Sequence, residues 1–211
     1  MNKFLQKLYQ RHHLEEKRSD FSIYKRERGE YFAKVIGIGK TILDLGCRDG
    51  TLTKYYVKGN KIVGLDIDKN LLEKAKKRLN IKTIHMNLYY KWTFDQKFDV
   101  IVAGEILEHL YYPEQIIKKC YRWLEPKGIL LVSVPNAYII SARIRFLFGR
   151  EIPAHRDPTH INLFSQKKLK KMLGKYFKKV EISGIAPPIY KPFRLISNSL
   201  FADDLIAKAT R

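Results

Sequence analysis

Two short stretches of this 211-residue sequence carry side chains whose types and spacing suit chemistry. In TILDLGCRDG, an acidic residue, Asp44, precedes a short loop that contains two glycines. In GEILEHL, Glu105, Glu108 and His109 follow one another closely after an apolar run. Carboxylate and imidazole groups bind cations and transfer protons, so both stretches are candidates for a ligand site.

A third group of such side chains occupies the polar stretch GREIPAHRDPTHIN, residues 149–162. It contains His155, Asp157 and His160. A histidine in a loop over a pocket is suited to act as a general base. We expect His160, and after it His155, to fill this role, with a loop histidine bonded to backbone as the simpler alternative.

The elements that must position these groups alternate along the chain. Apolar runs predict five strands, at TILDL, KIVGLDI, IKTIHM, FDVIVAG and GILLVSV. Helical spacing predicts helices at 51–58, 69–79 and 113–124, with Lys127-Gly128 as a stop before the next strand. Strands that alternate with helices predict an α/β fold with a parallel sheet covered on both faces.

The two ends of the sequence follow other patterns. Helices are expected at 2–18, 22–36 and 137–148, and Ser165 is expected to cap a helix at QKKLKKMLGKY. FKKVEISGI and DDLIAKAT predict two late strands, joined by the proline-rich APPIYKPFRLISNSLF.

The glycine loop at 46–50 indicates what kind of cofactor the sheet binds. A dinucleotide site favours G-x-G-x-x-G, in which backbone N–H groups approach a pyrophosphate. Here Asp44 precedes the loop and Asp49 lies inside it, and two carboxylates repel a pyrophosphate. They suit S-adenosylmethionine, which carries a sulfonium and an ammonium group. Asp66, 22 residues after Asp44, is placed to accept hydrogen bonds from ribose hydroxyls.

Five motifs in order resemble the class I S-adenosylmethionine-dependent methyltransferases: ILDLGCRDG, GLDID, Met86-Asn87-Leu88, FDVIVAGEILEHL and LEPKGILLVSVPN. The resemblance implies a Rossmann-like, seven-stranded, mostly parallel sheet with an antiparallel last strand, DDLIAKAT. It implies a cofactor site made of Asp44, Gly46, Cys47, Gly50, Asp66, Ile67, Asn87, Leu88 and Gly104. The chain departs from the family at Arg48, where glycine is usual, and at Asn87, where aspartate is frequent.

The same resemblance narrows the acceptor. GEILEHL lacks the Asn/Asp-Pro-Pro-aromatic motif of exocyclic base-amine methylases. It looks like the ubiquinone-biosynthesis O-methyltransferases, which implies that Glu105, Glu108 and His109 bind a divalent cation such as Mg²⁺. Glu105 is also a candidate for catalysis, and the alternative is an ordinary helix start with His109 packed or capping.

The formal net charge of +20 favours an anionic partner such as RNA or a membrane surface, or reflects a lysine-rich solvated surface. Residues 143–179 hold eleven Lys or Arg residues against Glu151 and Asp157, a net charge of +9. AYIISARIRFLFGR mixes apolar residues with arginines, which suits a helix on an anionic membrane, a lid over a greasy substrate or a core-facing helix.

From these features we expect one methyltransferase domain over 1–211. Its parts are N-terminal helices (1–38), a cofactor-binding core (39–136), a substrate cap (137–175) and C-terminal strands (176–211). The N-terminus is too charged for a secretory signal, and two cysteines outside any metal motif suit the cytoplasm. The expected reaction is O-methylation of a small or lipid-like hydroxylated acceptor. The alternatives are an RNA or protein methyltransferase and a protein that binds the cofactor without catalysis.

Overall fold

The structure is a computed structural model that describes Arg11 and residues 22–155, 157–193 and 196–211. These residues form two compact units. The first unit contains α2 (Lys25–Ile36), β1 (Thr41–Leu45), the 3-10 helix η1 (Thr53–Tyr55), β2 (Lys61–Asp66), α3 (Lys69–Leu79) and β3 (Lys82–His85). The second contains η2 (Leu107–His109), most of α4 (Pro113–Trp123), α5 (Ile140–Leu147), η3 (Pro153–His155), α6 (Gln166–Gly174), β6 (Lys179–Ile185), η4 (Pro188–Tyr190), α7 (Asn198–Phe201) and β7 (Asp204–Thr210).

Two further strands, β4 (Phe98–Gly104) and β5 (Leu124–Pro135), contribute residues to both units. The seven strands have the order β3-β2-β1-β4-β5-β7-β6, and β7 is antiparallel to both of its neighbours. This order confirms the predicted α/β fold with an antiparallel last strand. The four-part division of the chain expected from the sequence remains a prediction.

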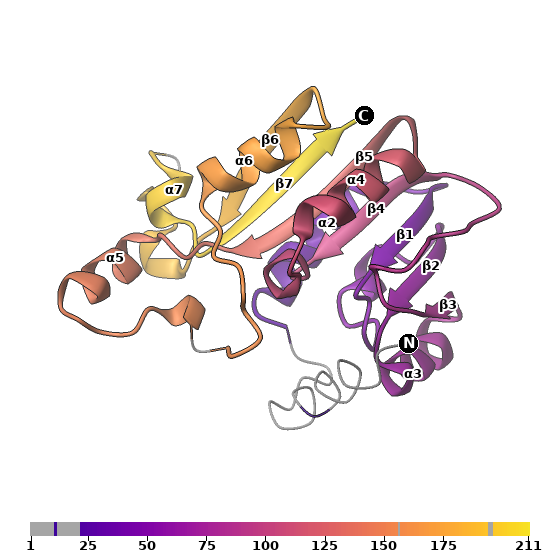
Figure 1. The fold of residues 1–211 in the computed structure, drawn as a ribbon, viewed down its shortest axis with the longest axis horizontal. Helices are drawn as coiled ribbons and strands as arrows, with labels where there is room; N and C mark the ends of the chain where they lie inside the picture. The colour runs from indigo at the N-terminus through magenta and orange to yellow at the C-terminus, as the bar shows by residue number, and fades with distance from the viewer. Residues whose placement is uncertain (1–10, 12–21, 156, 194–195) are drawn as a thin grey trace. The chain divides into compact units, whose positions relative to one another are not determined.

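In the first unit, β1 pairs with β2 and β2 pairs with β3, all in parallel. Their carboxyl ends therefore lie at one edge of the sheet. Figure 1 shows α3 beside β3, and the helix has the predicted range. It begins because the Asp68 side chain accepts hydrogen bonds from the backbone N–H groups of Asn70 and Leu71. It ends because Asn80 adopts a left-handed conformation.

The helix predicted at 51–58 is wrong. Only Thr53–Tyr55 form a helical turn, the 3-10 helix η1. Side chains in this segment bond elsewhere: Thr51 donates to Asp49, and Thr53 and Tyr56 donate to Asp44. Such local bonds compete with a continuous helix. The helix predicted at 22–36 is observed as α2, while the one at 2–18 lies outside the described residues, Arg11 excepted.

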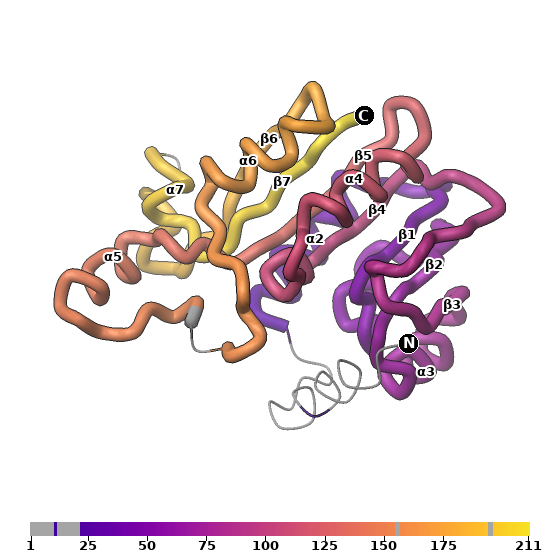
Figure 2. The backbone as a smooth tube through the Cα atoms, in the orientation of Figure 1, coloured from indigo at the N-terminus to yellow at the C-terminus, as the bar shows by residue number. Residues whose placement is uncertain are grey.

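In the second unit, β7 lies between β5 and β6 and pairs with both along its whole length. α6 begins where predicted, because the Ser165 hydroxyl accepts a hydrogen bond of 3.1 Å from the Lys168 N–H. α6 packs on β6 and β7, and Figure 2 traces the chain from α6 into these strands. The core of this unit is apolar on both sides of β7, since Leu205, Ile206 and Ala207 are all buried.

Two boundaries of the second half differ from expectation. β5 begins at Leu124, directly after α4, so the expected stop at Lys127-Gly128 lies within the strand. Lys127 there has a positive φ of 66°, which marks an irregularity in the backbone. α5 is shorter than the predicted 137–148, because Asn136 accepts a hydrogen bond from the Tyr138 N–H and forms a turn first.

Candidate functional site

The loop after β1 is held in a tight turn by its glycines and by β2. Gly46 and Gly50 have φ of 68° and 79°, a region that glycine adopts without steric cost. The N–H groups of Gly46 and Cys47 both donate to the Leu65 carbonyl of β2. A side chain at Gly50 would also collide with Leu79 of α3. The turn therefore needs glycine at both positions that the sequence indicated.

Asp44 lies at the carboxyl end of β1 and is 3% exposed. Its Oδ2 accepts hydrogen bonds of 2.7 Å from the hydroxyls of Thr53 and Tyr56. Burial raises the pKa of Asp44 to about 6, although the two hydroxyls oppose this shift. A buried carboxylate of this kind is stabilised by a cation, which is the property the sequence analysis required of it.

Asp66 organises the same loop from the end of β2. Its Oδ2 accepts a hydrogen bond of 2.9 Å from the Arg48 N–H, and its Oδ1 accepts one of 2.8 Å from the Asp68 N–H. Both oxygens of the Asp66 carboxylate therefore help to fix the backbone that follows β1 and β2. The next residue, Ile67, has its carbonyl bonded to Nε2 of His85 at 2.9 Å. No motif in the sequence indicates a role for His85.

Arg48 and Asn87, the two departures from the family pattern, both have structural roles. Arg48 has a positive φ of 50°, and its N–H makes the bond to Asp66. Asn87 accepts a hydrogen bond of 2.9 Å from the Tyr89 N–H and so forms a turn that aspartate would also form. Asn87 and Leu88 follow β3 and are both buried.

The Cys47 side chain is a packing group. It is 6% exposed, and burial, followed by the nearby carboxylate of Asp44, raises the pKa of its thiol well above the ordinary value. It fits against β2 because Gly64 has no side chain there: an added Cβ would lie 2.6 Å from the Cys47 sulfur. Its N–H is already donated to Leu65, so its contribution to a ligand would come from other backbone atoms.

The second unit holds the other candidate residues, beginning at the end of β4. Gly104 is the last residue of this strand and is half-buried. Glu105 follows with a φ of 53°, and its N–H donates to the Ser133 carbonyl of β5. The left-handed backbone conformation costs a glutamate about 1 kcal/mol of free energy. Such strain persists where the surroundings hold the residue in place, as they often do at functional sites.

Glu108, His109 and His160 form a compact cluster in the second unit. One potential ligand atom from each lies within 4.8 Å of the others, and the two imidazole rings are 4.9 Å apart. Glu108 is 1% exposed. The N–H groups of Ile161 and Asn162 both donate to its carbonyl, which fixes the loop that carries His160 against η2. The structure thus brings together two of the three stretches singled out in the sequence.

The hydrogen bonds of the two histidines define where their protons lie. His160 Nδ1 is 3.0 Å from the Ala154 carbonyl, and His109 Nδ1 is 3.1 Å from the Thr159 carbonyl. A carbonyl only accepts, so each Nδ1 carries a hydrogen, and in the neutral ring Nε2 presents a lone pair. His109 Nε2 lies 3.9 Å from Glu108 Oε1, and His160 Nε2 lies 3.7 Å from Asp157 Oδ2.

Thr159 connects this cluster to Asp157, a role that the sequence analysis missed. Its hydroxyl donates to Asp157 Oδ1 at 2.6 Å and lies 2.9 Å from His109 Nδ1. No motif marks this threonine, because its contact with His109 joins residues 50 positions apart. Glu105 is not part of the cluster, and only the backbone of His155 is described, in η3.

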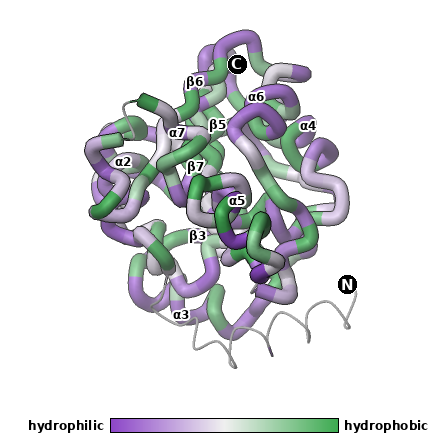
Figure 3. Tube along the Cα trace, turned by 90° about the vertical axis from the view of Figure 1, so that its left-hand side faces the viewer, coloured by the Kyte–Doolittle hydropathy of each residue, from purple (hydrophilic) through white to green (hydrophobic). Residues whose placement is uncertain are grey.

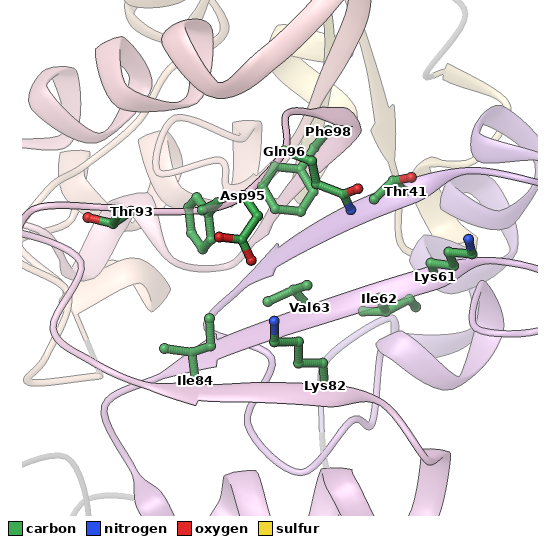
Figure 4. A pocket seen from close by; sticks show the side chains of 11 residues that line it. Thr41, Lys61, Ile62, Val63, Lys82, Ile84, Thr93, Asp95, Gln96 and Phe98 are labelled. Atoms are coloured by element: carbon green, nitrogen blue, oxygen red, sulfur yellow. The ribbon is translucent and has the colours of Figure 1, made fainter.

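The first unit contains a cavity of about 350 Å³. Its lining includes Thr41, Lys61 and Lys82, the first residues of β1, β2 and β3. Figure 4 shows Ile62, Val63 and Ile84 in its apolar part. Asp44 and Asp66 lie at the other ends of the same strands, where parallel sheets bind ligands. This cavity is therefore not the candidate cofactor site.

The strand order, together with the acid and glycine loop at the carboxyl end of β1, defines a Rossmann-like methyltransferase fold. Residues 9–176 match the family described as "Methyltransferase domain", and the chain belongs to this family.

Two curated relatives illustrate how far the similarity extends. A probable S-adenosylmethionine-dependent methyltransferase of Mycolicibacterium smegmatis is 30% identical over 137 residues, which are 64% of this chain and 50% of the relative. The ubiquinone biosynthesis O-methyltransferase of Coxiella burnetii is 35% identical over 104 residues, 46% of this chain and 44% of the relative. The matched regions thus span about half the length of these relatives.

Solved structures share the fold over most of the chain. A SAM-dependent methyltransferase from Archaeoglobus fulgidus has a TM-score of 0.68 at 19% identity, covering 90% of this chain and 93% of that one. The small RNA methyltransferase HEN1 has a TM-score of 0.69 at 21% identity, covering 88% of this chain and 25% of that one. These likenesses establish the fold. Among the described residues, no helix is both long and apolar enough to cross a bilayer.

Proposed function

We propose that this methyltransferase transfers a methyl group to a hydroxyl of a small or lipid-like acceptor. The observation that carries the proposal is the pair of imidazoles, His109 and His160, which form one cluster with the buried Glu108. In the neutral form of each ring, the hydrogen bond at Nδ1 leaves Nε2 with a lone pair. A hydroxyl is a weak nucleophile until it loses its proton, so O-methylation needs a group of this kind. The similarity to ubiquinone biosynthesis O-methyltransferases supports the same acceptor class.

The residues of the first unit that we propose to bind the cofactor lie at the end of β1, in the loop after it, and at or just after the ends of β2 and β3. The buried Asp44 carboxylate stabilises the cationic methionine part, and the turn at Gly46 and Gly50 lets the cofactor approach the backbone. Asp66 accepts from the ribose hydroxyls while it holds the loop. Ile67, Asn87 and Leu88 contact the adenine, and the Cys47 side chain packs the loop against β2.

In the proposed reaction, His160 Nε2 accepts the proton of the acceptor hydroxyl. The oxygen then forms a bond to the methyl carbon as the carbon–sulfur bond breaks, and S-adenosylhomocysteine leaves with the bonding electron pair. Because the sulfonium is already activated, the enzyme's main task is alignment of the two reactants. His109 and Glu108 orient the acceptor, and the Ala154 carbonyl keeps His160 in the tautomer that accepts a proton.

A divalent cation is a second way to activate the hydroxyl. Its ligands would be Glu108, His109 and His160, and the Ala154 and Thr159 carbonyls would support the two imidazoles. Two imidazoles with one carboxylate fit a transition ion such as Mn²⁺, Fe²⁺ or Zn²⁺ better than Mg²⁺, which prefers oxygen ligands. When bound, such a cation lowers the pKa of a hydroxyl that it contacts.

The experiment that tests the proposal is transfer of radiolabelled methyl from S-adenosylmethionine into an extract of the source organism. We expect label in the organic-soluble or small-molecule fraction, in alkali-stable form as for a methyl ether. Label in RNA or protein would contradict the proposal and favour the alternative use of the +9 segment at 143–179 as a docking surface. Cofactor binding without label in any fraction would favour a non-catalytic role.

The pKa of Asp44 predicts how cofactor affinity depends on pH. Its folded-state pKa is raised to about 6, so the carboxylate is ionised at pH 8 and increasingly protonated below pH 6. A cationic ligand needs the ionised form, so affinity is expected to fall about tenfold per pH unit below pH 6. Isothermal titration of S-adenosylmethionine between pH 5 and pH 8 measures this. A constant affinity over that range would exclude Asp44 as a ligand of the cofactor's cationic part.

A further inference from the structure

Several large apolar side chains are exposed at the end of α5 in the second unit. Phe146, Leu147 and Phe148 follow one another and are 75%, 81% and 76% exposed, and Ile144 is 48% exposed. Ala142 is the one residue of α5 that is buried. Figure 3 shows apolar and polar residues interleaved along this helix. Consecutive large apolar side chains at this level of exposure are unfavourable in water and mark an interaction surface.

Three arginines flank this apolar surface. Arg143, Arg145 and Arg150 lie among the apolar residues, and no acidic residue occurs in the chain from Tyr138 to Arg150. The Arg143 Nε donates to the Tyr138 carbonyl at 2.8 Å, which leaves the rest of its guanidinium available. Within the described part of the chain, no carboxylate forms an ion pair with any of the three. The surface is therefore both apolar and positively charged.

We propose that the α5 surface, defined as residues 143–150, docks the protein on an anionic lipid bilayer. The apolar side chains would enter the boundary between headgroups and acyl chains, and the arginines would bind lipid phosphates. Eight residues of helix are too short to span a bilayer, so the docking is peripheral. The proposal stands apart from the identity of the methyl acceptor.

Charge and hydrophobicity together favour a bilayer over other occupants. A second copy of the chain, related by a two-fold axis, would bring the same arginines face to face, and like charges repel at an interface. RNA would bind the arginines but would leave Phe146, Leu147 and Phe148 in water. An anionic bilayer satisfies the charged and the apolar side chains at once.

The test is sedimentation of the full chain with vesicles of phosphatidylcholine alone or with about one third phosphatidylglycerol. We expect binding to the anionic vesicles and little binding to the neutral ones. The double variant Phe146→Ser/Phe148→Ser should bind at least about tenfold more weakly, because it no longer has these two apolar side chains to bury in the bilayer. The double variant Arg145→Gln/Arg150→Gln should also bind more weakly, by about fivefold for each arginine.

A matched control separates docking by this surface from general attraction of a basic protein. Lys167→Gln/Lys170→Gln removes the same charge from exposed positions of α6 and should reduce binding less than the arginine variant. Equal effects of the two charge variants would overturn the proposal, as would wild-type binding by the phenylalanine variant. Concentration-dependent dimers in size-exclusion chromatography, lost in the phenylalanine variant, would identify a second copy as the occupant instead. Unfolding temperatures and cofactor affinities should match the wild type, since all altered side chains are at least partly exposed.

Discussion

Asp44→Asn is expected to weaken S-adenosylmethionine binding by ten- to a hundredfold and to stabilise the protein without cofactor above pH 6. A hydrogen bond or ion pair to a charged group contributes about 1.5–3 kcal/mol, which corresponds to this loss of affinity. The amide oxygen of asparagine still accepts hydrogen bonds, so the hydroxyls of Thr53 and Tyr56 keep an acceptor. The expected loss of cofactor affinity is therefore caused by the missing charge and not by a change in the shape of the side chain.

The gain in stability follows from the direction of the pKa shift. Burial raises the pKa of Asp44 from 3.8 to about 6, so the folded state binds the proton more tightly than the unfolded state does. That contribution is fully present below pH 3.8 and is lost as the pH rises through about 6. At pH 8 the wild type thus holds a desolvated carboxylate, and the variant should be more stable by about 3 kcal/mol.

Urea unfolding at pH 8 and isothermal titration with the cofactor measure the two effects. Asp99→Asn is the control in the same unit, because Asp99 accepts a hydrogen bond from the Thr41 N–H at the amino end of β1. It should lower stability slightly and leave affinity unchanged. If Asp44→Asn bound the cofactor as tightly as the wild type, Asp44 would have only a structural role. Lower stability at pH 8 would show that its hydrogen bonds outweigh its desolvation.

His160→Gln is expected to lower the turnover number at least about 100-fold, the usual contribution of a general base. The cofactor's affinity should not change, because the residues proposed to bind the cofactor do not include His160. Glutamine resembles histidine in size and can still bond to the Ala154 carbonyl, so the loop should stay in place. Single-turnover kinetics on the acceptor identified from the extract measure the chemical step, and thermal unfolding reports on folding.

Metal removal distinguishes the two ways of activating the hydroxyl. With His160 as base, protein dialysed against a chelator keeps its turnover, and His160→Gln loses far more activity than His109→Gln. With a bound cation, dialysis abolishes turnover, added Mn²⁺ restores it, and both variants lose the ion in elemental analysis. Lys175→Gln serves as a control in the same unit, because its exposed ion pair with Glu114 contributes little and should leave turnover unchanged.

The strands and the glycine turn after β1 could be predicted because their signals are local. The strand at 98–104 and the helix at 69–79 have the expected bounds, since an apolar run and a capping aspartate lie within the elements themselves. The segment after the loop could not be predicted. Its helical spacing was outweighed by hydrogen bonds from Thr53 and Tyr56 to Asp44, which depend on the folded position of β1.

The cluster of Glu108, His109 and His160 shows the same limit. Histidines at 109 and 160 were both identified as candidates, but for separate roles, because nothing in the sequence places residues 51 positions apart next to each other. The carbonyl of Glu108 and the hydroxyl of Thr159 join them in the folded chain. Glu105 was grouped with Glu108 and His109 through the resemblance to the ubiquinone-biosynthesis O-methyltransferases. In the structure His160, and not Glu105, joins Glu108 and His109 in the cluster, and Glu105 has a left-handed backbone.

The position of β7 between β5 and β6 has a consequence for how the second unit forms. β6 pairs with β7 alone, yet β7 comes later in the chain. During synthesis, β6 therefore leaves the ribosome before its partner and has no strand to join. Its edge stays open until β7 arrives, which exposes an aggregation-prone intermediate. β7 also pairs with β5, so the pairing of both β5 and β6 depends on this one late strand. A variant that slows the insertion of β7 should therefore lower the yield of folded protein. Its effect on the free energy of unfolding should be smaller.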